Sequence, residues 1–169
     1  GGYHAAKPGR MQDLINFHIS QNNTAVLNML NAKYLIVQGE EGPQAQINPN
    51  ALGNAWFVSK VELAKDPNEE ILKLGTVNLR TTAVVNDSLQ GVVEEVVGKD
   101  PIGEPGTIEL VQYQPNKLVY QTDAPEDRLA VFSEMYYPHG WKVTIDGQQA
   151  AHFPANYLLR AMVIPAGSH

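Results

Sequence analysis

The sequence contains no cysteine, no long apolar run and no cluster of basic residues, and each absence removes a class of function. Without cysteine there is no disulfide, no thiol nucleophile and no thiolate ligand for a metal. No apolar stretch approaches the roughly 18 residues that a membrane-spanning helix needs, and no signal-peptide pattern opens the chain. The 169 residues carry 12 basic and 18 acidic side chains, a net charge of −6, so nucleic acid is not an expected partner.

Motifs for catalysis, metal binding and phosphate binding are also missing. The sequence has no GxSxG nucleophile motif, no HExxH pair and no glycine-rich phosphate loop. Its neighbouring carboxylate pairs are adjacent in sequence, and adjacent side chains point apart on a helix or a strand. We therefore predict no catalytic residue, no metal site and no cofactor. The composition, 43% hydrophobic and 18% charged, is that of a folded globular chain.

The first part of the chain, residues 1–97, mixes helix and strand patterns. Apolar residues at helical spacing over 11–19 predict a helix, and a second is expected to begin at Asn23 or Thr24, either of which can cap it. Residues 34–37 are strand formers in an apolar run and predict a buried strand, followed by a loop over 38–54.

A helix start is encoded at Asp66-Pro67, with Glu69 placed to reach back toward the cap. Gly75 is placed to end this helix. Strands are expected on either side of it, over 55–63 and 79–85, while residues 88–97 fit a short helix or a strand.

The second part of the chain is predicted to be β. Residues 98–106 hold three glycines and two prolines and form a linker or long loop. Beyond it, Pro115-Asn116 and Asp146-Gly147 are hairpin turns between short strand patterns. Strands are expected over 107–113, 117–122, 128–136, 141–145, 148–153 and 157–164. The predicted fold is α+β, with a mixed helix and strand subdomain (1–97) followed by an antiparallel, sandwich-like subdomain (107–169) that looks cut at its C-terminal end.

The segment from Tyr136 to Trp141 is the best candidate for a binding site. Three aromatic residues surround a Pro-x-Gly turn, and aromatic faces stack on the C–H surfaces of sugars while hydroxyl and imidazole groups bond sugar hydroxyls. The alternative is that Trp141 begins an inward-facing alternation and fills the core. For the N-terminal residues Tyr3 and His4, the alternative is an ordinary contact of the chain's tail. The candidate glycan-contacting residues are Tyr136, Tyr137, His139 and Trp141, with Tyr3 and His4 as a second group.

Eight short strings, in this order, resemble the C-terminal soluble region of YfhO-family bacterial membrane proteins, in the Bacteroidetes version. Together they span nearly the whole chain. They are GGYHAAK at 1–7, RMQDL at 10–14, NMLNAKY at 28–34, GNAWFV at 53–58, YQPN at 113–116, FSEMYYPHGWK at 132–142, NYLLRA at 156–161 and IPAGSH at 164–169.

This resemblance implies an extracytoplasmic domain attached to a multi-span membrane protein that is similar to lipid-sugar-using glycosyltransferases of the GT-C type. The catalytic carboxylate of such enzymes lies between early membrane helices, so no catalytic residue carries over to this chain. The family continues after the final string with another strand, which the sequence here does not contain.

Two functions are therefore expected, from different classes. The first is a non-catalytic accessory domain that positions a cell-surface glycan or a lipid-linked sugar for its own membrane-spanning portion. The second is a structural or assembly domain that packs on that membrane portion or on a partner and binds no ligand. A free-standing hydrolase is the third and least supported, because no acid–base or nucleophile constellation is present.

Overall fold

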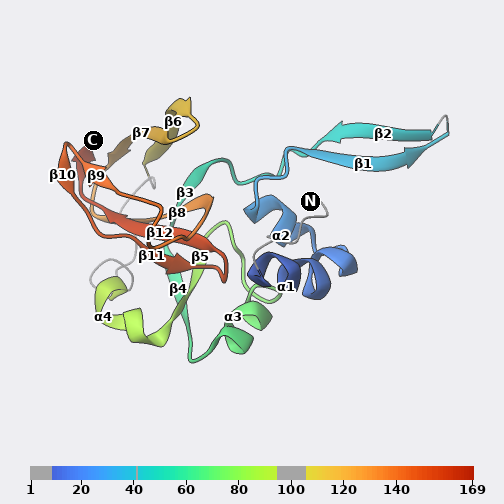
Figure 1. Cartoon of the computed structure of the whole chain (residues 1–169), viewed down its shortest axis with the longest axis horizontal. Helices are drawn as coiled ribbons and strands as arrows, with labels where there is room; N and C mark the ends of the chain where they lie inside the picture. The colour runs from blue at the N-terminus through green and yellow to red at the C-terminus, as the bar shows by residue number, and fades with distance from the viewer. Residues whose placement is uncertain (1–8, 41, 95–105) are drawn as a thin grey trace.

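The computed structural model describes residues 9–40, 42–94 and 106–169, in which short helices and several small sheets surround one central sheet (Figure 1). The helical elements, each a few turns at most, are α1 (Gly9–Phe17), η1 (Ile19–Gln21), α2 (Thr24–Met29), α3 (Pro67–Lys73), η2 (Asp87–Leu89) and α4 (Gln90–Val93). The strands are β1 (Tyr34–Gly39), β2 (Gly42–Ile47), β3 (Ala55–Val58), β4 (Lys60–Ala64), β5 (Thr82–Asn86), β6 (Thr107–Gln114), β7 (Lys117–Ala124), β8 (Arg128–Met135), β9 (Thr144–Ile145), β10 (Gln148–Gln149), β11 (Phe153–Ala155), β12 (Leu159–Ile164) and β13 (Gly167–Ser168). This arrangement confirms the predicted α+β class and the β-rich second part.

The central sheet has four antiparallel strands in the order β11-β12-β8-β3. Its edge strand β3 comes from the first part of the chain and pairs with residues 129–132 of β8. Successive side chains on a strand point to opposite faces. Accordingly, Leu129 and Val131 of β8 belong to one apolar cluster, whereas Ala130 and Phe132 belong to another. The sheet therefore has a buried layer on each side.

The first layer contains the helices and the parallel pair β4–β5. Leu14 of α1, Met29 of α2 and Ile71 of α3 are all buried against the face of the sheet that carries Leu129 and Val131. Burying one such side chain contributes about 1.5–3 kcal/mol relative to leaving it in water. These short helices consequently owe their stability to packing on the sheet rather than to their own length.

The second layer is the three-stranded sheet β13-β7-β6, which covers the other face. The ring of Tyr120 on β7 meets the ring of Phe132 on β8 edge to face, with centroids 5.0 Å apart. Ile108 on β6 and Met162 on β12 belong to the same cluster. Two antiparallel sheets therefore face each other, as expected for the second part of the chain. The four residues of β3, which pair with β8, join the first part of the chain to the second.

The turn between β11 and β12 fastens β5 to the central sheet. Asn156 and Tyr157 both have left-handed backbones, with φ of 50° and 68°. The Asn156 N–H donates to the Val84 carbonyl (2.7 Å), and its side-chain Oδ1 accepts from the Val84 N–H (2.8 Å). The next amide, that of Tyr157, donates to Glu70 Oε1 on α3 (2.8 Å), where burial raises the pKa of the carboxyl. This one tight turn thus joins β5 and α3 to the central sheet.

Three local predictions are confirmed. Asp66 caps α3, because its Oδ1 accepts a hydrogen bond from the Glu69 N–H at 2.9 Å. The helix ends at Lys73, before Gly75. Glu69 itself reaches back to the Lys65 N–H rather than to that of the cap. The Pro115–Asn116 turn joins β6 and β7, and Asp146–Gly147 joins β9 and β10 with positive φ at both residues (51° and 82°).

The strand predicted over 34–37 is confirmed as part of β1, but the predictions that it is buried and that a loop covers 38–54 were wrong. Strand β1 pairs with β2, and the two form a hairpin that projects from the body (Figure 1). On one of its faces Tyr34, Ile36 and Ile47 are 65%, 71% and 75% exposed. Apolar strand formers specify a strand here, but nothing among the described residues covers this face.

Two further strand predictions need correction. The expected strand 55–63 is two strands, because β3 joins β8 in the central sheet while β4 turns away to pair with β5 in parallel. The alternation over 141–145 forms a strand only at Thr144–Ile145. The region 88–97 is helical through Val93, and residues 95–105, with most of the expected linker, lie outside the described residues. In the part of the chain that the structure describes, no helix has both the length and the apolar character needed to cross a membrane.

Candidate functional site

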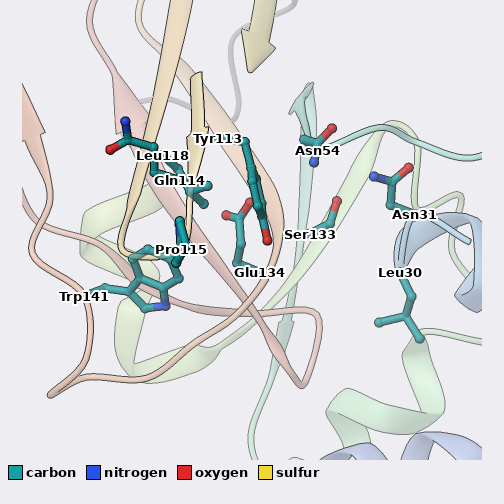
Figure 2. A pocket seen from close by; sticks show the side chains of 10 residues that line it. All are labelled: Leu30, Asn31, Asn54, Tyr113, Gln114, Pro115, Leu118, Ser133, Glu134 and Trp141. Atoms are coloured by element: carbon teal, nitrogen blue, oxygen red, sulfur yellow. The ribbon is translucent and has the colours of Figure 1, made fainter. Parts of the chain in front are cut away.

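An open cavity of about 350 Å³ lies where the β6–β7 turn, the end of β8 and the loop before β3 meet. Figure 2 shows Trp141 and Pro115 on one side of the view, Asn31 and Asn54 on the other, and Glu134 between them. The residues that line it are Leu30, Asn31, Asn54, Tyr113, Gln114, Pro115, Leu118, Ser133, Glu134 and Trp141.

The carboxylate in the middle of the cavity is held on both oxygens. Glu134 Oε2 accepts from Arg160 Nε (3.1 Å) and from Arg160 Nη2 (2.8 Å), while Oε1 accepts from the Tyr120 hydroxyl. The Arg160 side chain is 5% exposed and that of Glu134 is 17% exposed, so the pair is largely shielded from solvent. Burial and the bond to Glu134 together raise the pKa of Tyr120, which stays a hydroxyl donor. These bonds hold the carboxylate in a fixed position at the cavity and leave Oε1 able to accept one further hydrogen bond.

Two contacts hold the Trp141 side chain in place. Its indole Nε1–H donates to the Met135 carbonyl at 3.3 Å, and the Arg160 guanidinium lies over its ring, 4.7 Å from Arg160 Cζ to the centroid. Beside Tyr136, His152 has its pKa lowered by burial and by the charge of Arg160. The ring is therefore a preorganised aromatic wall, half-buried and with Arg160 on one of its faces.

Arg160 is the common element of this arrangement. Its guanidinium also lies 4.6 Å from the ring centroid of Phe132. Arg160 on β12 is the cross-strand partner of Phe132 on β8, so the two share the face that carries Glu134. The sheet register thus places one cation between a carboxylate and two aromatic rings, where each contact is stronger than it is in water.

The opposite wall supplies amide groups. Asn31 ends the turn after α2 with a left-handed backbone (φ 55°), and its buried Oδ1 has no hydrogen-bond partner in the described parts of the chain. Asn54 lies beside Ser133, whose hydroxyl donates to the Gly53 carbonyl and whose N–H donates to the Asn54 carbonyl (2.9 Å). Because the Ser133 hydroxyl is bonded to a carbonyl rather than to a base, it is not an activated nucleophile.

The other aromatic residues of the predicted site lie on the turn beside the cavity and do not line it. Tyr137 is 61% exposed and lies over Gly140, where an added Cβ would be 2.1 Å from Tyr137 Cδ1. Tyr136 is half-buried against His152, with ring centroids 5.3 Å apart. His139 is exposed on the turn.

Of the predicted site residues, Trp141 is therefore the one that lines the cavity. It is neither a core residue nor part of a strand, so the core-filling alternative does not describe it. Tyr3 and His4 lie outside the described residues. The sequence reading missed Glu134, Arg160 and Asn31. Glu134 and Trp141 fall within one of the short strings noted above, but no pattern in the sequence links them to Arg160.

The groups that line the cavity can bind a ligand. Its carboxylate is neutralised by Arg160, and in the described parts of the chain no group of three or more metal-ligating side chains is gathered. What the cavity offers a ligand is an aromatic face, a fixed acceptor and amide groups.

Comparison of the chain with family models, with curated proteins and with solved structures finds no match in any of the three.

Proposed function

We propose that this chain is a non-catalytic, extracytoplasmic accessory domain of a membrane-embedded, lipid-sugar-dependent glycosyltransferase-like protein, and that it holds a neutral glycan in the Trp141 cavity. The resemblance to the YfhO family supports the setting: the extracytoplasmic side of a bacterial membrane, next to the domain's own membrane-spanning portion. The cavity supports the ligand class. The observation that carries the proposal is the placement of a fixed carboxylate between an aromatic wall and an amide wall.

The polar groups of the cavity match sugar hydroxyls. A hydroxyl both donates and accepts, so one can donate to Glu134 while another accepts from the side-chain amide of Gln114 or Asn54, all of which line the cavity. The bond that a sugar hydroxyl donates to the Glu134 carboxylate is charge-assisted, so it is stronger than the bond that a hydroxyl accepts from an amide. A hydroxylated ring packed on Trp141 would also remove apolar C–H surface from water.

The charge balance argues for an uncharged sugar. Glu134 and Arg160 cancel each other, and the remaining lining residues in the described chain carry no charge. An acidic sugar would face Glu134 without a free cation, and an amino sugar would compete with Arg160 for the same carboxylate. We therefore expect neutral hexoses or N-acetylated sugars.

An affinity comparison tests the proposal. Neutral trisaccharides of glucose, mannose and N-acetylglucosamine are titrated into the whole chain and followed by amide-resolved NMR. Removing one aromatic contact costs on the order of 1 kcal/mol, so Trp141→Ala is expected to weaken binding about five-fold or more. The exposed Tyr137, which lies off the cavity, gives the matched control, and Tyr137→Ala is expected to bind as the unmodified protein does. Equal losses in both variants, or no saturable shift with any glycan, would overturn the proposal.

A structural or assembly role is the second candidate, and the exposed β1–β2 hairpin favours it. An isolated two-stranded hairpin is at best marginally stable in water, and this one leaves Tyr34, Ile36 and Ile47 uncovered. Packing on the membrane portion of the same protein or on a partner would cover that face. If no glycan binds, this role becomes the leading one.

A further inference from the structure

A second cavity, of about 480 Å³, runs along the edge strand β3, at the other end of β8 from Glu134. Ala55 and Phe57 of β3 and Ile108 of β6 give it apolar walls. The described residues that line it include two charged ones, Arg80 and Arg128, and no acidic one. The described charges that line this cavity are therefore positive, although the chain carries a net charge of −6.

Of the two arginines, Arg128 gives the stronger evidence for a ligand. It begins β8 on the face of the sheet that carries Phe132 and Glu134, and its side chain is 5% exposed. Nη2 lies 3.0 Å from Glu126 Oε1, an ion pair without the geometry of a hydrogen bond. Among the described residues, neither Nη2 nor Nε has a hydrogen-bond partner. A guanidinium has five N–H donors, and leaving a buried charge with one ion pair is costly.

Arg80 also lines this cavity and is exposed. Its guanidinium makes one long bond, from Nη2 to the Asn50 carbonyl at 3.4 Å, so little holds it away from a ligand. Ser59 and Thr81 add hydroxyl groups to the lining.

We propose that this cavity binds an oxyanion, the phosphate or carboxylate group of a ligand, between Arg128 and Arg80. Two oxygens of such a group match the planar fork of a guanidinium and would supply the acceptors that Arg128 lacks. The site is separate from the Trp141 cavity and does not depend on the proposed glycan function.

Titration of the whole chain with inorganic phosphate at pH 7 tests this site, with sodium chloride of equal ionic strength as the reference. NMR follows the Arg128 Nε–Hε resonance and the backbone amides of Ser59 and Thr81. The expected result is a saturable shift of these three signals with phosphate and none with chloride. A parallel titration with acetate distinguishes a carboxylate ligand from a phosphate one, because the better match saturates at lower concentration.

Two variants decide between specific binding and general charge attraction. Losing one exposed charge partner changes binding by up to about five-fold, so Arg80→Gln is expected to weaken phosphate binding by about that factor. Lys33→Gln removes the same charge at the base of the β1–β2 hairpin and is expected to leave affinity unchanged. Glu126→Gln removes the carboxylate that competes for Arg128 and is expected to tighten binding.

Three results would overturn the site: shifts that do not saturate, shifts that chloride reproduces, or an equal effect of Arg80→Gln and Lys33→Gln. Arg128→Met is not needed for this decision, because the loss of a buried side chain can unfold the protein. Glycan binding at Trp141 is measured on different signals, so the failure of either site leaves the other testable.

Discussion

Replacing Arg160 with methionine is expected to destabilise the fold strongly, although the new side chain is of similar length. The change removes both bonds from the guanidinium to Glu134 Oε2, at 3.1 and 2.8 Å, and both contacts with aromatic rings. Glu134 is then left largely buried, with the Tyr120 hydroxyl as its remaining partner.

The expected magnitude follows from the burial of the pair. Breaking a buried ion pair by removing one partner costs about 3–5 kcal/mol, because the other charge stays buried and unpaired. Glu134 keeps 17% exposure, so we place Arg160→Met near the lower end, at about 3 kcal/mol. Adding Glu134→Gln removes the orphaned charge, so the double variant is expected to recover about 1–2 kcal/mol of that loss.

Urea unfolding, followed by tryptophan fluorescence and far-UV circular dichroism, gives the free energies of unfolding of the unmodified protein, the two single variants and the double variant. Glu62→Gln is the matched control, because Glu62 is half-exposed and forms a surface ion pair with Lys73 at 3.5 Å. It is expected to cost less than about 1 kcal/mol. A loss below about 1 kcal/mol for Arg160→Met, or additive effects in the double variant, would refute the claim that this pair is buried and coupled.

Further predictions concern the turns and the end of the chain. Asn156→Ala leaves a buried backbone amide of β5 without its acceptor and puts alanine in a left-handed backbone, so urea unfolding is expected to show a loss of about 2–4 kcal/mol. Gly140→Ala pushes the Tyr137 ring off the turn, but that ring is exposed, so its NMR signals are expected to move while stability changes by less than about 1 kcal/mol. The bond to Asp146 raises the pKa of His169, so its stabilising effect is complete below the ordinary histidine pKa and is lost as the pH rises through the raised value. Asp146→Asn is expected to abolish this part of the pH dependence of unfolding.

The parts of the fold that the sequence predicted correctly are encoded locally. The cap at Asp66 and the turns at Pro115–Asn116 and Asp146–Gly147 depend on residues within four positions of one another. The hydrogen-bonding groups that satisfy these backbones are neighbours in the chain, so the pattern is sufficient.

The failed predictions concern contacts between distant residues. Strand formers at 34–37 predict a strand, but they do not specify whether another element covers it, and here none of the described elements does. The split between β3 and β4 occurs because β3 pairs with a strand more than 70 residues later in the chain. No local pattern carries that information.

In the candidate site, too, local sequence predicted one part and contacts between distant residues determined the rest. The aromatic segment indicated Trp141, because aromatic residues beside a turn stand out in a sequence with few of them. Arg160 reaches Glu134 and Trp141 only through the pairing of β8 with β12, which places it opposite Phe132. Asn31 joins from the turn after α2, in the first part of the chain. A single sequence does not give that register, so the carboxylate and the amide wall became visible only with the structure.

The two tryptophans make the central claim directly measurable. Trp141 lines the cavity, whereas Trp56 is buried in the core, where its indole N–H donates to the Leu79 carbonyl at 3.0 Å. In a titration with neutral oligosaccharides, the account predicts a saturable shift of the Trp141 indole N–H signal while the Trp56 signal stays in place. A Trp141 signal that never moves, or one that moves only together with that of Trp56, would contradict a glycan site in this cavity.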